Sequence, residues 1–199
     1  MDVHANWGEF IKMINQQENP ISVRSKKWLT DALFELLKEK PYDKISIREI
    51  AKKADLTRQT FYHNFTSKDM LLTYKSDQLF SDFYDFASKN NIRTMPDLLV
   101  FFFRYWQDHA DFIKILIENN MQHILTCRYP DYFRFVGILK MDDNFTEEQQ
   151  ECAYAFFSGA LIYLLCKWME QGMKSSPKEM SKLVMSIIGG DFYLMERNT

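Results

Sequence analysis

Several features that would assign this chain to a common class are scarce or absent. Its 199 residues contain only three cysteines, Cys127, Cys152 and Cys166, which are odd in number and lack CxxC spacing, so a disulfide framework is not expected. Six glycines and five prolines exclude a collagen-like or low-complexity chain. Glycine-rich phosphate loops, nucleophile elbows and HExxH motifs are also missing. We therefore expect a protein that is not an enzyme and holds no cofactor.

Long apolar runs and a hydrophobic leader are missing too. The first ten residues, MDVHANWGEF, are interrupted by polar side chains at every second or third position, and apolar runs such as 153–166 are shorter than a membrane-spanning helix. These absences predict a cytoplasmic protein without membrane contact. The formal net charge is only −2, yet residues 24–68 carry 11 Lys/Arg against 6 Asp/Glu, which leaves the rest of the chain acidic. A basic segment on an acidic body is typical of a protein that meets phosphate at one end.

Helical periodicity dominates what is present. Hydrophobic residues make up 46% of the chain and aromatic residues 16%, and they recur at intervals of three and four, so we predict an all-α fold. Residues 1–24 are interpreted as an N-terminal extension whose apolar run ends at Pro20. A first core helix is predicted from about Ser25 to Lys40, with its apolar stripe formed by Trp28, Leu29, Ala32, Leu33, Leu36 and Leu37.

Three helix starts then follow within about 20 residues. Ser46 and Glu49 form a capping box, Thr57 is a good N-cap, and a further start is expected after Thr66 or Ser67. The first two starts leave room only for a tight turn around Asp55. Such a short connection is typical of a helix-turn-helix.

The helix that begins after Thr57 has the side chains that a major groove requires. Phe61 and Phe65 are four residues apart and can anchor it inward, so that its polar residues project outward. Arg is suited to guanine, Gln to adenine, and the Thr methyl group to the thymine methyl group. Arg48, in the first turn of the preceding helix, is placed to contact phosphate.

The segment TFYHNFTSKD, residues 60–69, resembles the T-[LF]-Y-x-[HY]-F-x-S-K-[ED] signature of TetR-family transcriptional regulators. The resemblance extends over residues 25–72, and Asp55 stands where many members of the family have glycine. It implies a helix-turn-helix DNA-binding domain at 25–68 and a body at 69–199 that binds a small-molecule effector and dimerises through its last two long helices. The implied DNA-binding residues are Arg48, Thr57, Arg58, Gln59, Thr60, Tyr62, His63 and Lys68, with Tyr62 and Lys68 as phosphate contacts.

Within the body, long helices are predicted at about 70–87, 96–109, 112–127 and 146–172, followed by a final helix capped at Ser176. Aromatic residues with polar groups are candidates for an effector pocket: Phe102, Tyr105, Trp106, Tyr154 and Tyr163. The apolar residues of the 146–172 helix exceed one face, which favours a two-fold four-helix bundle. The predicted dimer interface comprises Phe156, Gly159, Ala160, Tyr163, Leu183 and Ile187.

The sequence therefore predicts a homodimeric repressor that binds near-palindromic double-stranded operator DNA and responds to an effector. Two alternatives stay open. His123 and Cys127 have a spacing that can hold a metal, with Asp108 and His109 as possible further ligands, which would suit a metal-responsive regulator of the same fold. A metal site is nevertheless not predicted, because two ligands do not complete one. The other alternative is a helical scaffold with a vestigial helix-turn-helix.

Overall fold

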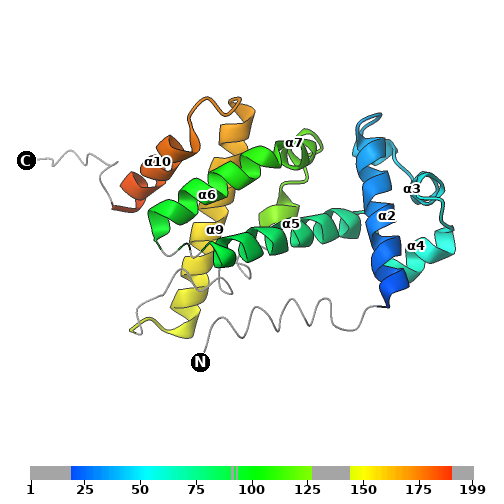
Figure 1. The fold of residues 1–199 in the computed structure, drawn as a ribbon, viewed down its shortest axis with the longest axis horizontal. Helices are drawn as coiled ribbons and strands as arrows, with labels where there is room; N and C mark the ends of the chain where they lie inside the picture. Colours follow the sequence, from blue (N-terminus) through cyan, green and yellow to red (C-terminus); the bar gives the residue numbers. More distant parts are fainter. Residues whose placement is uncertain (1–18, 91, 93, 127–143, 190–199) are drawn as a thin grey trace, which may run out of the picture.

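A computed structural model describes residues 19–126, apart from 91 and 93, and residues 144–189 (Figure 1). These residues form helices and connecting turns without a strand, which confirms the predicted all-α class. The elements are α2 (Pro20–Leu37), the short 3-10 helix η1 (Tyr42–Lys44), α3 (Ile47–Lys53), α4 (Arg58–Asn64), α5 (Asp69–Lys89), α6 (Met95–Asp108), α7 (Ala110–Glu118), α9 (Glu147–Glu170) and α10 (Pro177–Gly189).

The chain is arranged as a small module and a larger body. Helices α2, α3 and α4 pack together as the module, and α6, α7, α9 and α10 belong to the helical body (Figure 1). Helix α5 runs from the module into the body (Figure 1). At the junction, the ring of Phe34 on α2 lies 5.7 Å from that of Phe112 on α7.

Helix α2 begins earlier than the sequence predicts. Pro20 is its first residue instead of the end of an apolar run, and the Asn19 side chain caps the helix by accepting from the Ile21 N–H at 3.0 Å. Proline is well tolerated there because its missing N–H would have no helical partner. Residues 20–24 therefore belong to α2, while residues 1–18 lie outside the described part. Trp28 is also misassigned to the core, because it is 43% exposed, with the Arg24 guanidinium 4.9 Å from its ring centre.

The predicted 112–127 helix is interrupted. Helix α7 ends at Glu118, and Asn120 takes a positive φ of 56° before a new helical segment begins at 123. Asparagine adopts this left-handed conformation more readily than most residues, so the Asn119–Asn120 pair acts as a stop signal that the apolar pattern concealed.

Local capping patterns are confirmed. Ser46 and Glu49 form the predicted capping box of α3, Thr57 caps α4, and Thr146 with Gln149 forms a second capping box at α9. These interactions depend on residues three positions apart and are therefore visible in the sequence.

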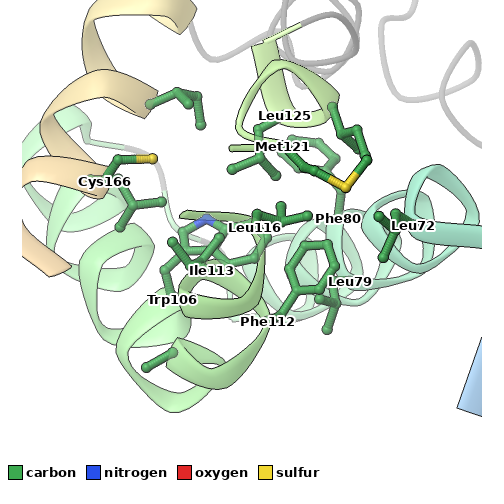
Figure 2. Packing of buried hydrophobic residues seen from close by; sticks show 14 of the residues in the cluster. Leu72, Leu79, Phe80, Trp106, Phe112, Ile113, Leu116, Met121, Leu125 and Cys166 are labelled. Carbon is green, nitrogen blue, oxygen red and sulfur yellow. The ribbon is translucent and has the colours of Figure 1, made fainter. Parts of the chain in front are cut away.

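One continuous core joins the module to the body. It includes Leu29 and Phe61 of the module and Phe103 of the body, all fully buried. In its central part, side chains of α5, α6 and α7 meet Met121, Leu125 and Cys166, the last from α9 (Figure 2).

Helix α9 is the one helix of the described residues that is long and apolar enough to cross a membrane by length and composition. Core helices of soluble proteins pass the same test. Its buried residues, among them Ile162, Leu165 and Trp168, pack inside the body, while Phe156 and Tyr163 are exposed.

Candidate nucleic-acid interface and the helical body

Helix α4 has one buried side and one exposed side. Phe61 and Phe65 are 0% and 3% exposed, with ring centres 6.0 Å apart. The side chains of Arg58, Gln59, Tyr62 and His63 are exposed. The helix therefore presents guanidinium, amide, phenol and imidazole groups to the outside while two rings hold it on the module.

Two threonines at the start of α4, the N-cap Thr57 and Thr60 in its first turn, are partly engaged in capping the helix. Thr57 Oγ1 accepts from the Thr60 N–H at 3.0 Å and lies 2.9 Å from Thr60 Oγ1. Asn64 closes the other end, since its Nδ2 donates to the Thr60 carbonyl and its Oδ1 accepts from Ser22 Oγ at 2.6 Å. The sequence pattern places Ser22 in the N-terminal extension. Its hydrogen bond to Asn64 links α2 to α4, and the sequence does not reveal this bond because Ser22 and Asn64 are 42 positions apart.

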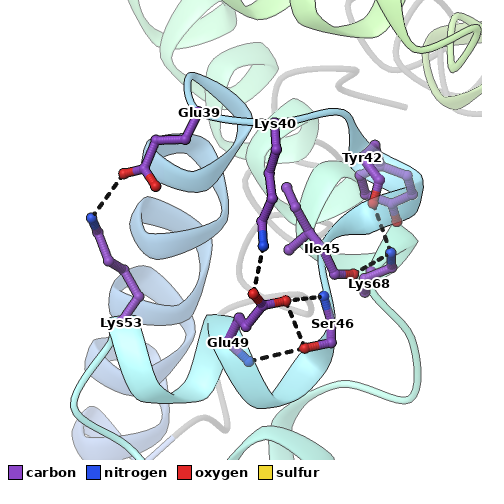
Figure 3. Close-up of polar contacts among 8 residues, drawn as sticks. All are labelled: Glu39, Lys40, Tyr42, Ile45, Ser46, Glu49, Lys53 and Lys68. Carbon is purple, nitrogen blue, oxygen red and sulfur yellow. Dashed lines mark hydrogen bonds and ion pairs between the residues drawn. The ribbon is translucent and has the colours of Figure 1, made fainter.

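Arg48 is exposed in the first turn of α3, next to a fixed N-terminus. Glu49 accepts from Lys40 at 2.5 Å and from the Ser46 backbone N–H at 3.0 Å (Figure 3). These donors, with Lys40 first, lower the pKa of the Glu49 carboxyl to about 2. The carboxylate is thus engaged with its neighbours, which leaves Arg48 as an exposed cation of this turn.

Lys68 has partners within its own chain. Its Nζ donates to the carbonyls of Tyr42 and Ile45 at 2.9 and 2.6 Å, and lies 4.3 Å from the centre of the Tyr42 ring (Figure 3). Two of its three N–H groups are used in this way. The predicted phosphate contact would therefore be made by the third N–H, and it stays a prediction.

The body contains a largely apolar cavity of about 340 Å³ between α5, α6, α9 and α10. Phe102 and Tyr163, two of the predicted pocket residues, line it. The other three do not. Trp106 is fully buried in the core, Tyr154 is 9% exposed, and Tyr105 donates its hydroxyl to the Leu79 carbonyl at 2.5 Å, while burial raises its pKa.

The same cavity brings predicted interface residues together. Phe156 and Tyr163 on α9 are 70% and 73% exposed, and Ala160 lies on the same face between them. All three, with Ile187 of α10, line the cavity. Leu183 of α10 is half-buried against the core. At Gly159, no atom lies within 4 Å of the position that a Cβ would take, so this part of the α9 surface is open to the close approach of another helix. The outer α9 surface containing Phe156, Ala160 and Tyr163 is called the α9 face below.

No cluster of three or more His, Cys, Asp or Glu side chains able to hold a metal lies among the described residues. His123 is exposed, while Cys127 lies outside them. The Cys166 thiol is buried, and burial raises its pKa to about 11, so this thiol is not predisposed to ionise.

Helices α3 and α4, joined by a tight turn and carrying an exposed polar side beside a helical body, have the arrangement of a helix-turn-helix DNA-binding protein. Comparison with family models identifies the family. Residues 29–74 match the model described as bacterial regulatory proteins of the tetR family, and residues 93–190 match a transcriptional regulator C-terminal region of the same group. Together the two matches cover well over half of the chain. The chain is a transcriptional regulator of the TetR family.

Two individual relatives match about half of the chain, at low sequence identity. The chain is 24% identical over 111 residues to the HTH-type dhaKLM operon transcriptional activator DhaS of Lactococcus lactis subsp. lactis (strain IL1403), over 54% of this chain and 58% of that protein. It is 32% identical over 108 residues to the transposon Tn10 TetC protein of Escherichia coli, over 53% of this chain and 50% of that protein. The chain thus spans only about half to three fifths of the length of these relatives.

Two solved structures share the fold. The dihydroxyacetone kinase operon activator DhaS aligns with a TM-score of 0.54 and 18% identity, over 84% of this chain and 95% of that chain. The fatty acid degradation regulator FadR from Bacillus halodurans aligns with the same TM-score and identity, over 89% of this chain and 100% of that chain.

Proposed function

We propose that this regulator binds a near-palindromic operator as a homodimer, with one α4 helix of each copy in a major groove. The observation that carries the proposal is the division of α4 into a buried phenylalanine pair and an exposed polar side. In this arrangement Arg58, Gln59 and His63 face base edges. Their guanidinium, amide and imidazole groups provide the hydrogen bonds that distinguish base pairs in that groove.

Other residues of the module contact the backbone. Arg48 is an exposed cation at the N-terminus of α3, where a helix end and a positive charge both favour phosphate. Tyr62 is 51% exposed and offers a phenolic hydroxyl next to the base-reading residues. Thr57 and Thr60 contribute mainly methyl groups, since their hydroxyls also serve the helix cap. This surface binds and does not catalyse, and we expect the protein to act in the cytoplasm, where its DNA is.

Dimerisation is assigned to α9 and α10. Large apolar side chains at 70% and 73% exposure are unfavourable in water, and a second copy packed on the α9 face would bury them. This arrangement explains the apolar excess of α9 without a membrane. The second copy also covers the open side of the cavity, so that a small, mainly apolar effector is enclosed between α5, α6 and the dimer interface.

The regulator is proposed to repress transcription by occupying its operator, and to leave it when the effector favours a spacing of the two modules that does not fit one DNA segment. In vitro transcription from the regulator's own upstream region, with and without the protein, measures the sign of regulation. A rise in transcript with protein would show activation and remove the repressor assignment.

Selection of preferred sites from random duplexes tests the proposed function. The expected product is a two-fold symmetric sequence whose half-sites lie one helical turn, or a multiple of it, apart. Arg58→Ala should lower affinity for that site by about 1–3 kcal/mol and relax the base preference at one position in each half-site. Arg104→Ala, at an exposed arginine of α6 in the body, is the matched control and should leave both unchanged. Retention of duplexes without any sequence preference would instead favour a scaffold with a vestigial helix-turn-helix.

A further inference from the structure

Tyr42 is bonded to both sides of the junction between module and body. Its backbone N–H donates to Asn119 Oδ1, at the end of α7, at 2.9 Å. Its carbonyl accepts from Lys68 Nζ at 2.9 Å, and its hydroxyl donates to the carboxylate of Asp69, the first residue of α5. One residue therefore joins the end of α7 to the point where the module continues into α5.

Asn119 is fixed on the body side of this contact. It follows α7 directly as the C-cap, and its Nδ2 donates to the Ile115 carbonyl at 2.8 Å. Helix α7 is itself embedded in the core through Phe112, Ile113 and Leu116. A displacement of α7 consequently carries Asn119 Oδ1 with it. Well-formed N–H···O bonds extend only to about 3.2 Å. A shift of less than about 1 Å would therefore lengthen the 2.9 Å bond beyond that range.

Lys68 fixes Tyr42 on the module side. It donates to the Tyr42 carbonyl and, at 2.6 Å, to the carbonyl of Ile45 (Figure 3). Ile45 directly precedes Ser46, the N-cap of α3. Ile45 is only 2% exposed, so this segment is anchored in the core. The position of Tyr42 is thereby linked to the start of α3, which packs against α4.

We propose that Asn119 couples α7 to the orientation of the DNA-binding module, and that Lys68 is the positioning residue that links Tyr42 to α3 and α5. The Asn119–Tyr42 bond gives the junction two states, bonded and open, and a displacement of α7 favours the open state. The consequence for transcription rests on the proposed function, because a reoriented module presents α4 differently to DNA.

Hydrogen exchange at the Tyr42 amide tests the coupling without DNA or effector. Asn119→Leu removes the acceptor, so exchange should accelerate by roughly threefold to tenfold. Asn119→Asp retains an acceptor oxygen, and exchange should stay within about twofold of the wild-type rate. Asn90→Leu is the matched control. Asn90 Nδ2 donates to the Phe86 carbonyl at 2.8 Å, just as Asn119 Nδ2 donates to the Ile115 carbonyl, but Asn90 lies at the far end of α5. It should leave Tyr42 unaffected.

Two results would overturn the proposal: Tyr42 exchange in Asn119→Leu at the wild-type rate, or equal acceleration in Asn90→Leu. If Asn119→Leu does not fold cooperatively, Asn119→Ser, whose side chain is too short to reach Tyr42, replaces it with the same expected result. On the selected operator, Asn119→Leu should weaken binding at least about threefold with an unchanged salt slope. Failure to select any operator would remove the proposed function, while the exchange measurement would still decide the coupling.

Discussion

Replacement of Asp55 by glycine should stabilise the helix-turn-helix. Asp55 follows the Ala54 C-cap of α3 and has a φ of 54°. Its N–H donates to the Lys52 carbonyl, and the Leu56 N–H donates to that of Ala51 at 2.8 Å, a pair of bonds that terminates a helix and requires a left-handed residue between them. An L-residue in this conformation costs about 1–2 kcal/mol, less for Asp than for most, whereas glycine adopts it freely but loses about 0.5–1 kcal/mol of chain entropy.

The charge of Asp55 adds a second contribution. A carboxylate beside the negative C-terminus of α3 is unfavourable by about 0.3–1 kcal/mol. Asp55→Gly should therefore raise the free energy of unfolding by about 0.5–1 kcal/mol, and Asp55→Asn by the charge contribution alone. Asp55→Ala removes the charge but also the side chain's tolerance of positive φ, and should be less stable than Asp55→Asn by about 1 kcal/mol.

Urea denaturation at low and high salt measures these differences. Asn120→Gly is the control, because Asn120 has the same φ range, at 56°, and the same two helix-ending bonds but no charge. Its effect should be independent of salt, whereas the gain in Asp55→Asn should fade as salt rises. Asp55→Ala as stable as Asp55→Asn would show that the turn does not require a left-handed residue, and would refute the reasoning.

Two further substitutions test the positioning and dimer assignments. Lys68→Met leaves the Tyr42 and Ile45 carbonyls without their charged donor, so unfolding should become easier by about 1.5–3 kcal/mol. Loss of the predicted phosphate contact should also reduce the salt slope of DNA binding by about one, and an unchanged slope would leave Lys68 with the positioning role alone. Lys52→Met, on the exposed α3 surface, is the control. Tyr163→Glu places a charge on the α9 face and should weaken self-association by about 2–4 kcal/mol, measured by sedimentation equilibrium. Lys114→Glu, at an exposed position of α7, is the control and should leave self-association unchanged. A dimer unaffected by Tyr163→Glu would place the interface elsewhere.

Local sequence is sufficient to specify helices α3 and α4 and the polarity of α4. The Ser46–Glu49 capping box, the Thr57 cap and the Phe61/Phe65 pair depend on residues three or four positions apart, and such interactions form wherever the local chain is helical. For the same reason, the TetR-type signature at residues 60–69 is recognisable in the order of the amino acids alone.

Packing between helices, in contrast, selects which aromatic side chains line a cavity and how the module is joined to the body. Trp106 and Tyr105 follow the same helical pattern as Phe102, yet only Phe102 reaches the cavity, because the neighbouring helices determine which part of α6 is covered. The Asn119–Tyr42 bond joins residues 77 positions apart, and no periodicity connects them. Contacts of this kind arise from the packing of whole helices, so they follow from the folded arrangement and not from the local sequence.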